Sequence, residues 1–244
     1  MRKSMVIGAL LAALAAGVVA MVYVTASSAE EETQYLCAGE PIRAPGECFA
    51  QGSNLETVVM QDRGSDSEIE CAPEAVLEEG TEGPGAEDEV SAISFKISAS
   101  GCKASAKALN AKEEEVTNGC SSLEKVVAVG LPWKTLLELI SGHFYDRTSP
   151  GPKGEQPGFA ITCGGITDTC RTEVKHNAAS EVANLDEVEG GLLLISVILP
   201  GAKGPEGESE LETCSIGGKK EGFVTGEILH VGVRNGVTVS LDVD

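Results

Sequence analysis

Hydrophobic and polar residues alternate in short runs along most of the chain, and glycine or proline separates one run from the next. In the segment 91–102, residues Ile93, Phe95 and Ile97 fall on one face, which is the period of two that a half-buried strand shows. The other segments with strand character are 55–61, 67–76, 123–133, 158–163, 180–199 and 209–216. The pattern predicts a mainly β fold, either an antiparallel β-sandwich or a partly closed β-barrel.

Three turns that contain glycine divide these runs into hairpins. Gly164–Gly165 joins the run 158–163 to the run 167–176, and Gly190–Gly191 divides the run 180–199. Asn235–Gly236 gives the clearest prediction, because both central positions of a type I′ turn need a positive φ and this residue pair favours it. The C-terminal run is therefore predicted to be a hairpin.

The stretch LPWKTLLELISGHFYDR, residues 131–147, contains the only tryptophan of the chain and has an ambiguous pattern. Trp133, Leu137 and Phe144 are spaced as on one face of a helix. Against this, Ser141–Gly142 has the composition of a two-residue hairpin loop. Periodicity alone leaves both a helix and a strand–turn–strand open.

Several short motifs resemble a family of uncharacterised, exported bacterial β-rich proteins. The motifs are LPWKTLLEL followed by DR, then PGFAITC, ITDTC and ETCSIGGKKEGFVTGE, and they cover roughly residues 71–244. The resemblance implies a small antiparallel β fold with LPW on a strand, so we expect residues 131–147 to form a strand–turn–strand. It implies no activity. The chain departs from the family pattern in its acidic stretch at 78–89 and in the segment with Cys37 and Cys48.

The first 29 residues have the pattern of a secretory signal peptide. Arg2 and Lys3 precede an apolar run of 20 residues, from Met5 to Val24, and small residues lead to a cleavage site after Ala29. An uncleaved membrane anchor is the alternative, because a run of this length can span a bilayer. The protein is expected to be secreted or extracytoplasmic.

The remaining chain is expected to have two parts. Residues 30–66 form a short N-terminal segment that its own cysteines pinch, and residues 67–244 form the antiparallel β domain. Inside that domain the stretch EEGTEGPGAEDE, residues 78–89, is acidic and poor in apolar residues, which predicts an exposed loop.

Acidic residues outnumber basic residues by 38 to 18, and the formal net charge is −20. Nucleic-acid binding depends on lysine and arginine at the phosphates, so no nucleic-acid partner is expected. Contact with an anionic membrane surface is not expected either, beyond the N-terminal anchor if it is retained. The charge is explained by solubility outside the cell, and the partner stays unknown.

Eight cysteines without any C-x-x-C pair, in an exported chain, predict disulfides and a fold that they staple. Pairing between neighbours in the sequence gives Cys37–Cys48, Cys102–Cys120 and Cys163–Cys170. It leaves Cys71–Cys214 to join the two ends of the β domain. With every cysteine paired, no thiol nucleophile is expected.

No motif fixes a catalytic activity. The G-x-S-x-G, H-E-x-x-H and P-loop patterns are missing from the sequence, so no catalytic, cofactor-binding or metal-binding residue and no cofactor is predicted. On a strand, His143, Tyr145 and Arg147 would point to one side, and Phe144 and Asp146 to the other. The first side is either a polar groove or the solvent face of a core hairpin.

Three carboxylates beside the turn at 190–191, Asp186, Glu187 and Glu189, are either weak candidates for Ca²⁺ or part of a solvated turn. The leading expectation for the whole protein is an exported, non-enzymatic β domain, a structural or binding module at the cell surface or in the medium. One alternative is a carrier of a small apolar ligand inside a β-barrel. The other is an enzyme of unrecognised type that uses the region 143–147.

Overall fold

Every regular element in the described part of the chain is a β-strand. The computed structural model describes residues 33–172, 178–188, 191–196, 211–216 and 218–244, and in these residues it contains 22 strands and no helix. All pairings between these strands are antiparallel. The antiparallel, mainly β fold predicted from alternation is confirmed.

The larger sheet has nine strands and curls round an interior. Its order is β17 (Gly191–Ser196), β16 (Ala178–Val188), β13 (His143–Thr148), β12 (Trp133–Ile140), β7 (Glu87–Phe95), β6 (Val76–Glu82), β3 (Cys48–Asn54), β20 (Ile228–Arg234) and β21 (Val237–Val239). β17 also pairs with β20, so the order from β20 to β17 returns on itself. We call these eight strands, from β20 round to β17, the ring.

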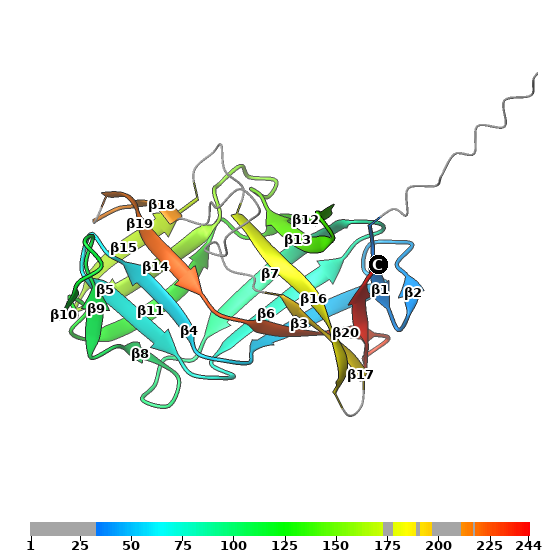
Figure 1. Cartoon of the computed structure of the whole chain (residues 1–244), viewed down its shortest axis with the longest axis horizontal. Coiled ribbons are helices and arrows are strands. Elements are labelled where there is room, and N and C mark those ends of the chain that lie inside the picture. Colours follow the sequence, from blue (N-terminus) through cyan, green and yellow to red (C-terminus); the bar gives the residue numbers. More distant parts are fainter. Residues whose placement is uncertain (1–32, 173–177, 189–190, 197–210, 217) are drawn as a thin grey trace, which may run out of the picture. The chain divides into compact units, whose positions relative to one another are not determined.

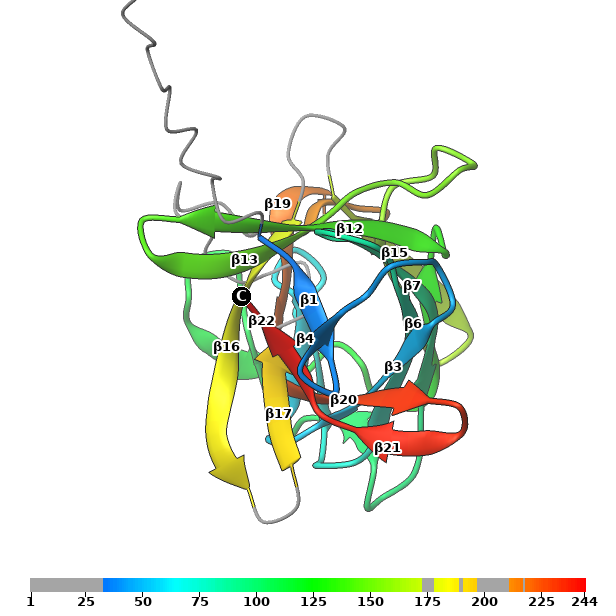
Figure 2. The ribbon, with the colours of Figure 1, turned by 90° about the vertical axis from the view of Figure 1, so that its right-hand side faces the viewer.

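A small third sheet lies inside the ring. It consists of β2 (Glu40–Pro41), β1 (Tyr35–Cys37) and β22 (Leu241–Val243). Figure 2 shows β1 and β22 enclosed by β12, β7, β6, β3, β20, β17 and β16. Tyr35, Leu241 and Val243 pack there against Leu137 of β12 and Val182 of β16.

The second large sheet has eight strands and lies beside the ring, at the left in Figure 1. Its order is β11 (Leu123–Val129), β14 (Gly158–Cys163), β15 (Ile166–Arg171), β18 (Leu211–Cys214), β19 (Gly218–Thr225), β4 (Val58–Asp62), β5 (Ser67–Cys71) and β8 (Cys102–Ala104). A hairpin of β9 (Lys107–Leu109) and β10 (Glu115–Thr117) follows β8 along the chain.

The main core holds side chains from both large sheets. Trp133 of β12 is 0% exposed, and its ring meets the edge of Phe159 of β14, with 5.6 Å between the ring centroids. The indole N–H donates to the carbonyl oxygen of Val129 at 2.8 Å, which satisfies its one polar atom. Trp133 therefore serves packing, as the residue types of this stretch indicate.

Residues 131–147 form the expected strand–turn–strand. β12 and β13 pair with Ile140 opposite His143 next to the turn and Leu137 opposite Asp146 at the far end. Ser141 and Gly142 between them have φ values of 55° and 86°, which a two-residue hairpin turn of this kind requires and a helix excludes. The helical spacing of Trp133 and Phe144 is accidental.

The other predicted turns also agree with the structure where it is described. Gly164 and Gly165, with positive φ, connect β14 to β15. Asn235 and Gly236 have φ values of 54° and 77° and connect β20 to β21, as the type I′ prediction requires. Residue 190 lies outside the described residues, but β16 and β17 on either side pair as a hairpin.

The acidic stretch 78–89 is not the exposed loop that its composition predicts. Its two halves belong to β6 and β7. These strands pair along their length, with Val76 opposite Phe95 at one end and Glu82 opposite Asp88 at the other. Glu78 and Glu82 point into the ring and are buried. The composition misled because acidic residues occupy inward positions that apolar residues usually hold.

The segment 30–66 is likewise not a separate appendage. Its β3 pairs with β20 and β6 in the nine-stranded sheet, and its β4 pairs with β19 and β5 in the eight-stranded sheet. Residues 31–244 form one compact unit.

All eight cysteines form disulfides, but only one of the four predicted pairs is correct. Cys37–Cys48 is confirmed. The other three bonds are Cys71–Cys102, Cys120–Cys163 and Cys170–Cys214, in place of Cys102–Cys120, Cys163–Cys170 and Cys71–Cys214. Pairing by sequence distance fails because two of these bonds join neighbouring strands of the eight-stranded sheet that are far apart in the sequence. Cys71 lies directly opposite Cys102, and Cys170 opposite Cys214.

Four disulfides indicate an oxidising, extracytoplasmic environment. The predicted signal peptide or anchor, residues 1–29, lies outside the described residues. Among the residues that the structure describes, no helix has the length and apolar character needed to cross a membrane.

Candidate functional site

The residues predicted as a polar groove share one face of β13. His143 is exposed, Tyr145 and Arg147 are half-buried, and Asp146 on the opposite face is buried. The Arg147 guanidinium forms an ion pair with Glu138 of β12, with 2.9 Å between Nη2 and Oε2. Neither of the two cavities described below includes these residues. The polar groove stays a prediction.

The other weak candidates cannot be placed. Glu189 and the side chains of Asp186 and Glu187 lie outside the described part of the structure. The structure brings together two clusters of buried acidic residues that the sequence did not predict as clusters. One lies in the eight-stranded sheet and the other inside the ring.

A cavity of about 180 Å³ opens at one end of the eight-stranded sheet. We call it the Asp pocket. Its lining residues are Asp62, Ser65, Ser67, Gly119, Ile161, Cys163, Ile166, Asp168 and Ile216. They come from the ends of β4 and β5 and from β14 and β15, which β18 and β19 separate in the sheet. The sheet is therefore curved enough to bring the two pairs of strands to opposite walls of one cavity.

Two buried aspartates face each other in this pocket. Asp62, the last residue of β4, is 1% exposed, and Asp168 of β15 is 9% exposed. Oxygen atoms of the two carboxyl groups lie within 4.8 Å of each other.

The local chain holds one oxygen of each carboxyl group in place. The Gly64 N–H donates to Asp62 Oδ1 at 2.9 Å, as the chain turns from β4 towards β5. The Ser215 hydroxyl and the Ile216 N–H donate to Asp168 Oδ1 at 2.7 and 2.9 Å. Both Oδ2 atoms are buried, and no donor among the described residues reaches either of them.

The two carboxyl groups have opposite pKa shifts. Burial and the hydrogen-bonding neighbour Asp168 raise the pKa of Asp62 to about 7. Burial alone would raise the pKa of Asp168 as well. Hydrogen bonds from Asp62, the Ser215 hydroxyl and the backbone outweigh burial and hold the pKa of Asp168 below its ordinary value. A proton held by Asp62 beside an ionised Asp168 accounts for the opposite directions of the two shifts.

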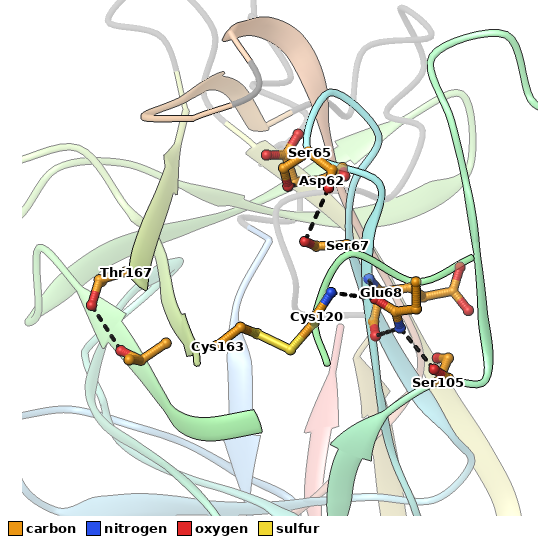
Figure 3. The surroundings of a disulfide bond; sticks show 10 residues. Asp62, Ser65, Ser67, Glu68, Ser105, Cys120, Cys163 and Thr167 are labelled. Atoms are coloured by element: carbon orange, nitrogen blue, oxygen red, sulfur yellow. Dashed lines mark hydrogen bonds between the residues drawn. A yellow bond between two sulfur atoms is a disulfide. The ribbon is translucent and has the colours of Figure 1, made fainter. Parts of the chain in front are cut away.

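The rim of the Asp pocket is apolar. Ile166 is 65% exposed and Ile216 is 51% exposed, which is high for side chains of this size. Ser65, in the turn between β4 and β5, and Ser67, the first residue of β5, stand on the opposite side. The Ser67 hydroxyl donates to the Ser65 carbonyl oxygen at 3.4 Å (Figure 3). The pocket thus combines an apolar edge with a polar wall and a floor that carries a negative charge.

A disulfide and one asparagine fix the remaining wall (Figure 3). Asn118 donates to the carbonyl oxygens of Glu68 and Ser105 at 2.7 and 2.8 Å, and its Oδ1 accepts from the N–H groups of Glu68 and Cys120. Cys120 is bonded to Cys163 at the end of β14. The segment 118–120 is therefore tied to β5 on one side and to β14 on the other.

The Asp pocket offers a metal ion two carboxyl groups but no thiolate. The Sγ atoms of Cys170 and Cys214 lie near the two carboxyl groups, but they form a disulfide and offer no thiolate. Two carboxylates are fewer ligands than the six to eight oxygens that Ca²⁺ takes.

The second acidic group lies inside the ring. Glu78 and Glu82 of β6 and Asp146 of β13 are buried, and Asp88 of β7 is half-buried beside them. Tyr35 of β1 lies in the same interior. No lysine or arginine among the described residues forms an ion pair with any of these carboxyl groups.

Burial without a cation raises the pKa values throughout this interior group. Burial and the charge of Asp146 raise the pKa of Glu82 to about 8, and burial raises the pKa of Asp146 itself to about 7. Burial followed by the charge of Asp146 also raises the pKa values of Glu78, Asp88 and Tyr35. The group is thus built to hold protons near neutral pH.

His230 of β20 reaches across Gly52 of β3 towards this group. Its Nε2 lies 3.4 Å from Glu78 Oε1, and burial lowers the pKa of His230 to about 4. A Cβ at position 52 would lie 2.3 Å from His230 Cδ2, so only glycine leaves room for the imidazole. The shifts of Glu78 and His230 both favour a neutral pair.

A larger cavity of about 470 Å³ lies over β6, β7 and β12. Its lining includes Glu87, Glu89 and Lys134, together with Asp88 and Thr135 next to the acidic interior. The lysine offsets part of the acidic charge there, whereas the Asp pocket has no basic residue among its lining residues.

Comparison with protein-family models, with curated proteins and with solved structures found no match to this chain.

Proposed function

We propose that the protein acts outside the cytoplasm as a non-enzymatic binding module whose ligand site is the Asp pocket. The observation that carries the proposal is the pair of exposed isoleucines, Ile166 and Ile216, at the mouth of a cavity that ends on two buried carboxyl groups. Exposed apolar side chains around a pocket mark binding sites. A few buried polar groups then orient what enters.

The size of the pocket limits the ligand. About 180 Å³ is less than the roughly 300–1,000 Å³ of sites for drug-sized molecules. The ligand is therefore a small molecule, or one side chain of a larger partner, with an apolar part that packs on the isoleucines.

The ring interior supports an apolar-ligand carrier less well than the Asp pocket does. β1 and β22 run through the ring, and its interior contains Glu78, Glu82 and Asp146 (Figure 2). An apolar molecule placed there would desolvate these carboxyl groups without pairing them, which is costly.

Binding of four-carbon probes tests the proposal. Protein-observed NMR with n-butanol, n-butylammonium and butanoate should shift resonances of the pocket residues in at least one titration. Ile166→Ser should weaken that binding about fivefold or more, because apolar contact is lost. Val237→Ser is the matched control, since Val237 is 62% exposed on β21 outside the pocket lining.

Two results would contradict the proposal. One is the lack of any pocket shift with all three probes at millimolar concentration. The other concerns catalysis, because an acid and a base side by side also serve hydrolases. Turnover of a panel of peptide, ester and glycoside substrates that Asp62→Asn abolishes would make the protein an enzyme.

A further inference from the structure

We infer that the floor of the Asp pocket binds the ammonium group of an alkylamine between the carboxyl groups of Asp62 and Asp168. The inference rests on the proposed function and names the chemical class of the ligand. Its first support is the pair of buried oxygens, Asp62 Oδ2 and Asp168 Oδ2, which lack any donor in the described structure. Both aspartates line a cavity that a hydrogen-bond donor of a ligand can enter.

The distance between the carboxyl groups suits a nitrogen donor. An ammonium nitrogen lies about 2.8 Å from a carboxylate oxygen, so it can bridge two oxygens up to about 5.6 Å apart. The carboxyl oxygens of Asp62 and Asp168 are within 4.8 Å of each other. An ammonium group can therefore bridge the two carboxyl groups, and two of its three donors serve the two bare oxygens.

Among the side chains that the structure describes, the charges around the pair favour a cation. Arg63 follows Asp62, but its guanidinium forms an ion pair with Glu113 at 3.0 Å and stacks over Phe223. Asp66 in the neighbouring turn and Glu68 on β5 are acidic, and the Glu68 carboxylate accepts from Gln61 Nε2 at 2.6 Å. β14 and β15 contribute Ile161, Cys163 and Ile166 to the lining, and no charge besides Asp168.

Binding releases one proton. Before binding, Asp62 holds the proton and Asp168 is ionised, so the pair has a charge of −1. After binding, both carboxylates are ionised and the ligand contributes +1, while the displaced proton leaves to solvent. The alkyl chain of the ligand then packs on Ile166 and Ile216, whose exposed faces border the cavity.

The test compares three matched four-carbon probes across pH. The dissociation constants of n-butylammonium, n-butanol and butanoate are measured by NMR titration of the wild-type protein from pH 5 to 8.5. The affinity for n-butylammonium should rise about tenfold per pH unit up to pH 7 and level off above it, because one proton is displaced. n-Butanol should bind more weakly and show no such slope, and butanoate should not bind.

Variants locate the effect. Asp168→Asn should weaken n-butylammonium binding about tenfold or more and remove the pH slope. Glu79→Gln, which removes an exposed acidic residue on β6 outside the pocket lining, should leave both unchanged. Calorimetry of the wild-type protein in two buffers of different ionisation enthalpy should detect the release of one proton, and this measurement needs no variant.

The outcomes separate the two proposals. Equal affinity for n-butanol and n-butylammonium, or n-butylammonium binding without a pH slope, overturns the inference and leaves the binding module standing. Failure of all three probes to bind overturns both.

Discussion

The acidic interior of the ring should make the protein less stable as pH rises from 5 to 8. Asp146 is 2% exposed, and burial raises its pKa to about 7, whereas an aspartate in the unfolded chain titrates near 3.8. Between these values the native state keeps a proton that the unfolded chain has released. Stability therefore falls with increasing pH across this window, by about 1.4 kcal/mol per pH unit for each such carboxyl group.

The substitution Asp146→Asn removes one titrating group and keeps the shape of the side chain. The slope of unfolding free energy against pH should become shallower by up to about 1.4 kcal/mol per pH unit between pH 5 and 7. Glu82, whose pKa is raised chiefly by burial, keeps a residual slope in the variant. Below pH 4 the effect of the substitution on the slope should vanish, because the unfolded chain is then protonated as well.

Guanidinium unfolding at pH 5, 6, 7 and 8, followed by the fluorescence of the buried Trp133, measures these slopes. Glu79→Gln is the matched control, because Glu79 neighbours Glu78 on β6 but points to the exposed face. An unchanged slope in Asp146→Asn, or a wild-type stability that increases with pH, would refute this reasoning.

Three further predictions concern the framework. Gly52→Ala should lower the unfolding free energy by about 1–3 kcal/mol, because the new Cβ would lie 2.3 Å from His230 Cδ2. Adding His230→Ala should recover part of that loss, and a neutral result for Gly52→Ala would count against the packing described. Trp133→Ala should cost about 3–5 kcal/mol by circular dichroism, and a cost below about 1 kcal/mol would show that Trp133 is not central to the core. Non-reducing peptide mapping should recover Cys71–Cys102, Cys120–Cys163 and Cys170–Cys214, and any Cys71–Cys214 peptide would contradict the fold.

Local signals in the sequence predicted the hairpins well. Turns such as Gly164–Gly165 and Asn235–Gly236 fix both the reversal of the chain and the register of the flanking strands, and few alternatives satisfy the same φ values. The pattern at 78–82 failed for the opposite reason. Glu78 and Glu82 take the positions that point into the ring, so the binary pattern looked like that of a solvated loop.

The candidate site could not be predicted from local patterns. Asp62 and Asp168 are far apart in the sequence, and only the curvature of the eight-stranded sheet brings their carboxyl groups together. The same holds for Cys170 and Cys214, whose partnership depends on β18 lying next to β15. The stretch 131–147 drew attention through its residue types. Of these residues, only Asp146 belongs to the acidic group inside the ring, because its side chain lies on the inward face of β13.

Direct titration of the Asp62 and Asp168 carboxyl carbons by ¹³C NMR decides whether the two residues share a proton at the floor of the Asp pocket. We predict one protonation step with a midpoint at about pH 7 that moves both signals together, and a second step below the ordinary pKa of an aspartate. Two independent titrations, each near the ordinary value of about 4, would show that the carboxyl groups do not act as a pair.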